Sequence, residues 1–278
     1  MIGTLRITVL SENTAGKAGV LGEHGLAFWI EADGHLLLFD TGQGKVLEHN
    51  ARELDVPLDR TELVVISHGH FDHTGGLAAV LNRNPQVPVC LHRAALNEKF
   101  ARQKRPPHRE IGIPRPCREA LQQHAGPLLW ASQPLELVPG VHVTGEIPRR
   151  NAFEDTGGAF FRDADCQQPD PLTDDQALFI ETAAGVLVVL GCAHAGVVNT
   201  LDYVAELANG RPIVAVFGGM HLVRAKPPRL EATLAALERY GVRQVAPAHC
   251  TGMRAASYLW SRLGAKCADC SVGSVFMA

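Results

Sequence analysis

The chain has 278 residues, a formal net charge of −3 at pH 7 and a sequence pI near 6.5. This length can bury a sizeable core, and 46% hydrophobic with 20% charged residues is typical of a globular domain. The charge gives no reason to expect nucleic acid or an anionic membrane as a partner, and no apolar run reaches the roughly 18 to 20 residues of a membrane helix.

Short runs of Val, Ile and Leu are separated by stretches with helical spacing, which indicates an α/β protein whose strands are buried on both faces. We expect strands at 4–10, 26–32, 35–39, 62–66, 87–91, 135–144, 176–182, 185–190, 212–217 and 243–247. We expect helices at about 44–54, 74–83, 92–104, 116–124, 196–208, 228–240 and 252–263. The dipeptide Asp33-Gly34 between two apolar runs is typical of a hairpin, so the predicted sheets are mixed.

Two regions interrupt this alternation. The segment 96–120 is rich in Lys and Arg and contains Pro106-Pro107 and Pro114, so we predict a basic surface excursion or lid. The segment 145–175 has the composition of a long loop. Neither is a Gly/Ser linker, and we expect one domain spanning residues 1–278.

The number of cysteines and the first ten residues predict the cellular compartment of the protein. Seven cysteines, an odd number, do not indicate a disulfide framework and fit a reducing environment. The first ten residues lack the features of a secretory signal and predict a strand. We therefore expect a cytoplasmic protein.

Four of the predicted buried strands each lead into a histidine within a few residues. The histidines are His68 with His70, His194, His221 and His249. Loops at the carboxyl ends of strands converge on a crevice in α/β proteins. We therefore predict that these histidines share one site.

The block from His68 to His73 has four side chains that can bind metal within six residues. His68 and His70 can reach one ion from an extended backbone, and Asp72 and His73 can address a second ion beside it. Imidazole and carboxylate ligands suit Zn, Fe, Mn, Ni or Co. The block predicts two divalent ions, zinc before the others; the alternative is an exposed histidine-rich loop.

This block resembles the HxHxDH signature of the metallo-β-lactamase superfamily, and Phe39-Asp40-Thr41-Gly42 resembles another motif of that family. The resemblance implies a four-layer αββα sandwich with two mixed sheets, which is the fold class we predict. It also implies that Asp40 supports the metal loop without binding metal. A structural turn is the alternative for Asp40.

Other segments resemble a narrower branch, that of 7,8-dihydropterin-6-methyl-4-(β-D-ribofuranosyl)aminobenzene-5′-phosphate synthase. They include Glu12-Asn13-Thr14, Glu23-His24-Gly25-Leu26, Gly145-Glu146-Ile147-Pro148-Arg149, Asp174-Asp175-Gln176, Gly191-Cys192-Ala193-His194, Gly218-Gly219-Met220-His221 and His249-Cys250-Thr251-Gly252. The branch resemblance brings Asn13 and His24 near the pocket as substrate-binding candidates.

The later motifs depart from the family pattern. His249 stands where the final histidine ligand belongs, but the expected bridging aspartate is replaced by Cys192 and His194. We take His194 as a metal ligand and leave Cys192 open between a ligand and a buried, inert cysteine. Glu146 falls where a middle histidine is usual, and it can bind metal or only orient its loop.

Three further residues are candidates for the substrate and the reaction. Arg149 and Arg150 can pair with a phosphate or carboxylate, unless they are merely solvated. His221 follows Gly218-Gly219, and we assign it a substrate contact or a proton-carrying role, alongside Asp72.

Hydrolysis is the default function, because paired divalent ions lower the pKa of a water and stabilise developing negative charge. We expect a small substrate that is phosphorylated or otherwise anionic, and leave a homodimer open. The branch resemblance implies an alternative, a transferase that condenses a dihydropterin pyrophosphate with an aminobenzene ribosyl phosphate. A ligand-binding sensor without catalysis is a third interpretation, and a redox di-iron protein a fourth.

Overall fold

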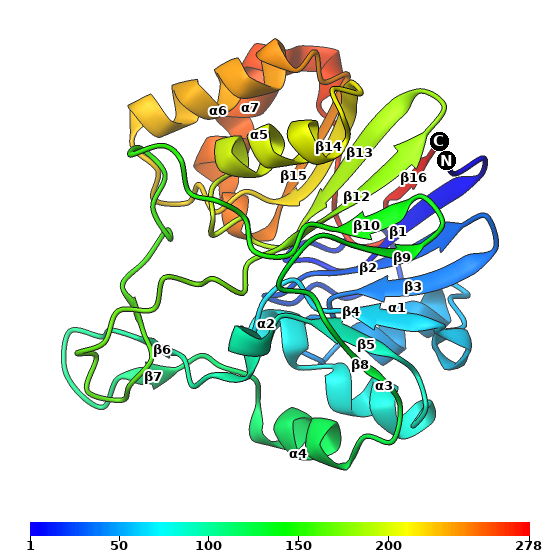
Figure 1. Ribbon diagram of the computed structural model, residues 1–278, viewed down its shortest axis with the longest axis vertical. Helices are drawn as coiled ribbons and strands as arrows, with labels where there is room; N and C mark the ends of the chain where they lie inside the picture. Colours follow the sequence, from blue (N-terminus) through cyan, green and yellow to red (C-terminus); the bar gives the residue numbers. More distant parts are fainter.

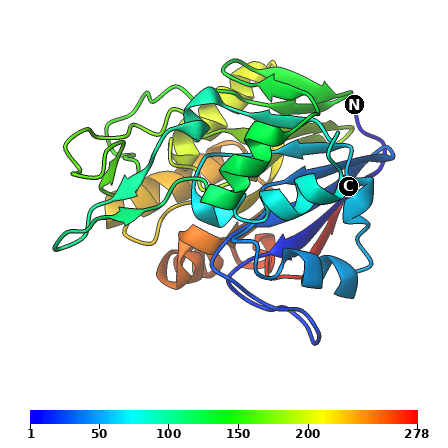
Figure 2. The same cartoon turned by 90° about the horizontal axis from the view of Figure 1, so that it is seen from below.

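The computed structural model describes all residues, 1–278. Two large mixed sheets pack face to face, and helices cover both outer sides (Figures 1 and 2). The two termini lie close together at one end of the sheets (Figure 1). This arrangement confirms the predicted four-layer αββα sandwich. None of the helices is long and apolar enough to cross a membrane.

The first sheet has the order β16-β1-β2-β3-β4-β5-β8. Its strands are β1 (Leu5–Ser11), β2 (Ala27–Ala32), β3 (His35–Phe39), β4 (Leu63–Val65), β5 (Val89–Leu91), β8 (Leu128–Trp130) and β16 (Val275–Met277). β16 to β3 pair antiparallel, whereas β3, β4, β5 and β8 are parallel. The β2–β3 hairpin turns at Asp33 and Gly34, both with positive φ, as the sequence predicts.

The second sheet has the order β15-β14-β13-β12-β10-β9. Its strands are β9 (Leu135–Val138), β10 (Val141–Val143), β12 (Ala177–Thr182), β13 (Gly185–Leu190), β14 (Ile213–Gly219) and β15 (Gln244–Ala248). Here β13, β14 and β15 are parallel. Each sheet therefore combines antiparallel strands with a parallel set whose carboxyl ends face one edge.

The helices divide between the two outer layers. Those beside the first sheet are α1 (Leu47–Glu53), α2 (Phe71–Thr74), α3 (Leu77–Arg83) and α4 (Arg115–Gln123), with the short 3-10 turns η1 (Leu58–Arg60) and η2 (Arg93–Leu96). Those beside the second sheet are α5 (Val197–Leu207), α6 (Pro227–Arg239) and α7 (Met253–Leu263), with η3 (His249–Thr251) and η4 (Gly264–Lys266).

Three hydrophobic clusters fill the three interfaces between the layers. Alternation along single strands divides their side chains between two clusters. Phe28 and Ile30 of β2 join the cluster between the sheets, whereas Ala27 and Trp29 join the one under α1, α3 and α4. β13 likewise divides its valines and leucines between the central cluster and the one under α5, α6 and α7. Burial on both faces explains why these strands are continuous apolar runs.

The structure corrects several predicted elements. The single strand expected at 135–144 is two strands, β9 and β10, because Pro139-Gly140 makes a turn with Gly140 at φ 80°. The helix predicted at 74–83 corresponds to α3, which begins at Leu77, and the separate short helix α2 at 71–74 was not predicted. The helix predicted at 92–104 is wrong: η2 ends at Leu96 and a short strand follows. Short strands such as β8 and β16 were not predicted.

The two irregular regions of the sequence pack against each other. β6 (Phe100–Ala101) and β7 (Arg109–Glu110) form a small sheet with β11 (Phe160–Phe161), which projects on the left of Figure 1. Lys99, at its base, is fully buried and contacts Asp170 and Asp174 with its Nζ at 2.9 Å from each carboxylate. This tertiary ion pair explains why the chain leaves the helix predicted at 92–104.

Candidate metal centre

Strand ends of both sheets bring the candidate residues to one edge. The residues that follow β3, β4, β13, β14 and β15 are Asp40, the His68–His73 block, Cys192 with His194, His221 and His249, in that order. The ring centroids of His68 and His194 are 4.8 Å apart, and those of His194 and His221 are 4.3 Å apart. Histidines from separate strands therefore meet at one site.

The backbone is strained where these strands end. Asp40, Ala193, His221 and His249 have positive φ angles of 60, 54, 43 and 50°. Non-glycine residues adopt this conformation at a cost of about 1–3 kcal/mol each, and such residues are concentrated at functional sites. Each of these four strained residues lies at or next to a candidate side chain.

The potential ligands fall into two adjacent groups that share one sulfur. We call His68, His70 and His194 the first group, and Asp72, His73 and His249 the second group. The ligand atoms of Cys192, His68 and His194 all lie within 4.8 Å of one another, and so do those of Cys192, His73 and His249. Cys192 Sγ is 3.1 Å from His73 Nε2. The thiol therefore lies between the groups.

Hydrogen bonds fix how four of these imidazoles are oriented. His194 Nδ1 is 2.7 Å from the carbonyl oxygen of Thr156, and His249 Nδ1 is 2.8 Å from Oδ1 of Asn13. These oxygens only accept, so each Nδ1 carries the proton and each Nε2 presents a lone pair. His73 Nδ1 likewise donates a hydrogen bond to Oδ2 of Asp40, which is 2.6 Å away.

His68 Nδ1 completes the pattern through Ser67. Ser67 Oγ donates to Asp40 Oδ2 at 2.6 Å and lies 2.9 Å from His68 Nδ1, so it accepts the imidazole proton. Nε2 of His70, His194 and His249 is buried without a hydrogen-bond partner. Buried lone pairs that face one another without a donor fit a cation between them. The donor set of imidazole, thiol and carboxylate fits a divalent transition metal.

Burial and charge act differently on the two groups. Burial lowers the pKa of His68, His70 and His194, that of His70 to about 4, so these imidazoles are neutral at pH 7. Burial would also lower the pKa of His73, but the charge of Asp40 and its hydrogen bond raise it to about 9. A neutral imidazole is the form that binds metal.

Asp72 is a buried carboxylate at the open side of the second group. Its Oδ2 is 3.1 Å from Nε2 of His24 and 3.4 Å from Nε2 of His249. Burial alone would raise the pKa of Asp72, but the hydrogen bond from His24 and the positive charge of His73 beside it hold the pKa well below its usual range. Asp72 is therefore ionised and faces the exposed His24.

Some of the residues predicted from the sequence line the hollow beside the histidines, and others lie elsewhere. Asn13, His24 and His221 line the hollow beside the histidines. Glu146 is exposed and belongs to none of the ligand groups, so the alternative of metal binding by Glu146 has no support in the structure. Arg149 donates to the carbonyl oxygens of His194 and Pro171. Arg150 pairs with Glu206 on the surface.

Other residues of the site stand in the motifs quoted from the sequence, but the sequence analysis assigned them no role. Asp174 accepts from Gly69 N at 2.8 Å and from buried Lys99, so the basic excursion holds the metal loop in place. Asp175, whose pKa burial raises to about 6, accepts from Ala195 N beside His194. Cys250 lies within reach of Cys192 and His221. The available signal was a pair of acidic residues, Asp174 and Asp175, just before the buried strand β12, because buried carboxylates need partners.

The hollow in front of the histidines measures about 460 Å³. Phe71, Ile111 and Phe160 supply apolar walls, and Arg102 and Arg109 supply positive charge. The two guanidinium carbons stand 4.2 Å from the Phe161 ring centroid and 4.6 Å from that of Phe71, respectively. This lining suits a ligand that combines an apolar or planar part with an anionic group.

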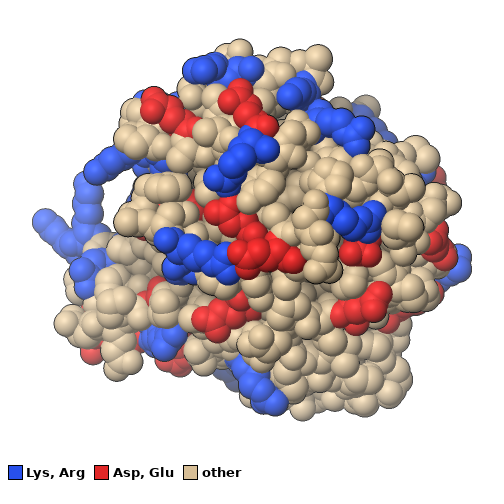
Figure 3. All heavy atoms as spheres, turned by 45° about the horizontal axis from the view of Figure 1, so that its top comes forward, with Lys and Arg blue, Asp and Glu red and all other residues tan.

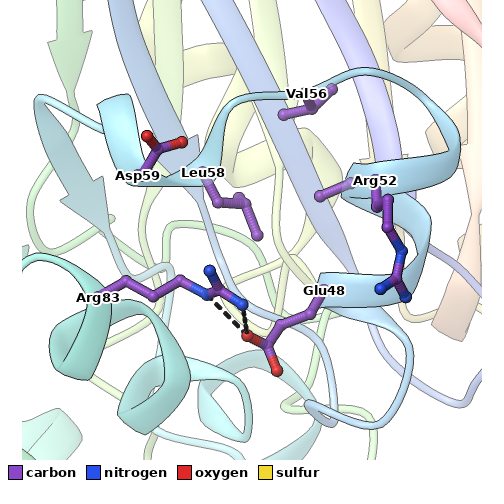
Figure 4. Close-up of a pocket in the computed structure, with 7 residues that line it drawn as sticks. Glu48, Arg52, Val56, Leu58, Asp59 and Arg83 are labelled. Atoms are coloured by element: carbon purple, nitrogen blue, oxygen red, sulfur yellow. Dashed lines mark hydrogen bonds and ion pairs between the residues drawn. The ribbon is translucent and has the colours of Figure 1, made fainter.

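A second large hollow lies away from the histidines, between α1, η1 and α3 (Figure 4). Its volume is about 420 Å³, and its polar side chains are Glu48, Arg52, Asp59 and Arg83. Glu48 and Arg83 neutralise each other in an exposed ion pair. No histidine or cysteine lines it, so the chemistry belongs to the histidine-lined hollow.

The fold and this edge of histidines define the class of protein. A model of the metallo-β-lactamase superfamily matches residues 21–204, and the chain belongs to this superfamily of metal-dependent enzymes.

Three similar proteins align with almost the whole chain. The chain is 28% identical over 266 residues to 7,8-dihydropterin-6-methyl-4-(β-D-ribofuranosyl)-aminobenzene-5′-phosphate synthase of Methanocaldococcus jannaschii, covering 91% of this chain and 90% of that one. It is 31% identical to Tm1679, a metal-dependent hydrolase of the β-lactamase superfamily, whose crystal structure aligns with a TM-score of 0.83 over 98% of both chains. Zn²⁺-bound PqqB from Methylobacterium extorquens, at 13% identity and a TM-score of 0.57 over 98% of this chain and 99% of that one, shares the fold.

Proposed function

We propose that the chain is a hydrolase with a dinuclear metal centre, acting on a small anionic substrate. The observation that carries the proposal is the sharing of Cys192 by two ligand groups whose imidazole lone pairs converge. His68, His70 and His194 would hold one ion, and Asp72, His73 and His249 the other. Zinc suits the imidazole and thiolate donors best, and iron, manganese, nickel or cobalt can replace it.

Bound ions of this kind supply an acidified water and neutralise negative charge that develops on the substrate. The protein residues orient and bind. Ionised Asp72 can accept a proton at Oδ2, and the exposed His24, whose Nε2 lies 3.1 Å away, holds this carboxylate in its ionised form. Arg102 and Arg109 attract an anionic group, and Phe71 and Phe160 exclude water from the apolar part of the substrate.

Transfer of a dihydropterin group is the second candidate. The observation that favours it is the similarity to the synthase of Methanocaldococcus jannaschii, at 28% identity over most of both chains. In that reaction class the departing group is an anion held at the same centre, and the apolar walls would hold planar rings. Hydrolysis is ranked first because the chain is 31% identical to Tm1679, a metal-dependent hydrolase.

Elemental analysis and product analysis together test the proposal. We expect two metal equivalents per chain, and reduced content in His70→Ala and Asp72→Ala. His35→Ala is a matched control, since His35 is exposed and paired with Glu62 on the β2–β3 hairpin. Wild-type protein should hydrolyse phosphodiesters or lactones, and both site variants should lose that activity.

The same assay separates the two candidates. Incubation with a dihydropterin pyrophosphate and an aminobenzene ribosyl phosphate yields a condensed product if the chain is a transferase. Wild-type protein that contains no metal after reconstitution, or site variants as active as wild type, would contradict both.

A further inference from the structure

A third hollow adjoins the one in front of the histidines. It measures about 320 Å³ and lies at the N-terminal end of α6. Gly157, His221 and Arg224 line both hollows, so they form the boundary between them. A Cβ atom on Gly157 would lie only 1.9 Å from Cδ2 of His221, so glycine is required for this close contact.

Three basic side chains and one acidic side chain line this hollow. They are Arg224, Lys226, Arg229 and Asp155. Arg224 and Lys226 are exposed and make no ion pair or side-chain hydrogen bond. Figure 3, in which the top of Figure 1 comes forward, shows Lys and Arg side chains interspersed with Asp and Glu over this face of the molecule. The hollow is therefore electropositive.

Arg229 is the unusual member of the set. Its side chain is only 7% exposed, and Nη1 donates to Asp155 Oδ1 at 2.6 Å. Nε and Nη2 are buried and have no hydrogen-bond partner. These two atoms form one edge of the guanidinium group and present parallel N–H groups, the geometry that matches a carboxylate or phosphate. A buried charged edge without an acceptor calls for a ligand.

In Arg83 the same guanidinium edge, formed by Nε and Nη2, has an acceptor within the chain. In the hollow between α1 and α3, Arg83 Nε and Nη2 both contact Oε1 of Glu48, at 2.7 and 2.5 Å (Figure 4). Arg83 therefore needs no external anion, whereas the equivalent edge of Arg229 has none of its own. The contrast points to an acceptor supplied from outside the chain.

We infer that the hollow beside α6 is an anion-binding subsite that takes a phosphate or carboxylate of the substrate, remote from the group at the metal centre. The substrate class then becomes a molecule with two anionic groups, one on each side of His221 and Gly157. This choice of substrate class rests on the proposed function, but the binding of an anion at Arg229 does not.

Inorganic phosphate is the probe for the subsite. Calorimetric titration of the metal-loaded wild-type protein should give one phosphate at the metal centre and a second in the subsite. Arg229→Met should weaken the second binding event by about tenfold or more, and Arg224→Gln by less. Arg83→Met is the matched control and should leave both events unchanged. Metal content, measured in parallel, should be the same in all four proteins.

The outcomes separate the subsite from the proposed function. If the wild-type protein binds a single phosphate that disappears with the metal, or if Arg229→Met and Arg83→Met bind phosphate alike, the subsite is refuted. Should Arg229→Met fail to fold, the exposed Lys226, which lines this hollow and not the one at the metal centre, carries the same test through Lys226→Gln. One further outcome is that the wild-type protein holds no metal after reconstitution and still binds a phosphate that Arg229→Met does not bind. That outcome refutes the hydrolase and retains the subsite.

A pair of inhibitors tests the substrate class. Propane-1,3-diol bisphosphate should bind the metal-loaded wild-type protein about tenfold more tightly than the monophosphate, because the second phosphate makes charge-assisted hydrogen bonds to the Arg229 edge. Arg229→Met should lose this preference, and Arg83→Met should keep it. Equal binding of the two compounds by wild-type protein refutes a doubly anionic substrate.

Discussion

The first and second ligand groups use different physical means to present metal-binding atoms. His68, His70 and His194 contain no carboxylate, and burial keeps them neutral. In the second group, ionised Asp72 is itself a member, and Asp40 lies behind His73. A divalent cation gains more electrostatic energy from the second group. The comparison teaches that two adjacent sites built from similar residues need not hold metal equally.

Replacing Cys192 should lower metal binding by both groups, and we expect the largest effect on metal content and activity from this change. Cys192→Ala removes the only ligand shared by the groups, so we expect both metal equivalents to fall and activity to drop by roughly 10²-fold or more. Elemental analysis and a hydrolysis assay measure the two effects. Cys250→Ala, a neighbouring buried cysteine, should retain both ions. Equal metal content in the two variants would mean that Cys192 is only a buried thiol.

Replacing one histidine in each group should separate the groups. His194→Ala should lose one equivalent of metal and keep the other, because the second group retains Asp72 and the support of Asp40. His249→Ala should lower the affinity of the second group for its ion, and the carboxylate of Asp72 should keep that group partly occupied. Titration with a chelator, followed by metal analysis, gives the two affinities. Loss of both ions from both variants would show that the groups act as one site.

The sequence predicted most of the sandwich because its strands are buried on both faces. Runs such as 185–190 are apolar throughout, and the structure has β13 at those residues. Short strands were missed because three residues, as in β8, carry no clear periodicity. The false helix at 92–104 has helical spacing, but the ion pairs of Lys99 with Asp170 and Asp174 are long-range contacts that local patterns cannot reveal.

The candidate site was predictable where its residues are close together in the chain. The His68–His73 block identifies itself by spacing, and His194 and His249 follow from their strand ends. Glu146 was placed by alignment to a motif, but its strand end leads to the surface. Arg149 and Arg150 could not be told from Arg224 and Arg229 by sequence, because only the fold decides which arginine lines a hollow.

Neutralising the carboxylate behind His73 should affect the second group more than the first. Asp40→Asn removes the charge that His73 Nδ1 faces at 2.6 Å, and we expect metal affinity of the second group to fall by about 10–100-fold. The first group is linked to Asp40 through Ser67, whose backbone N–H and hydroxyl both donate to the carboxylate and whose hydroxyl lies beside His68 Nδ1. Ser67→Ala is therefore the reciprocal variant. A larger loss from the first group in Asp40→Asn would reverse the comparison.

The smallest effect is expected from Asn13, which orients His249 through a neutral hydrogen bond of 2.8 Å. Asn13→Ala removes a contribution of about 0.5–1.5 kcal/mol, whereas a hydrogen bond to a charged group contributes about 1.5–3 kcal/mol. Metal affinity of the second group should therefore fall by about tenfold or less, and by less than in Asp40→Asn. The backbone of His249 stays fixed, because Glu12 accepts from its N–H at 2.7 Å. Chelator competition on both variants measures the ratio; equal losses would mean that orientation, and not charge, gives the second group its strength.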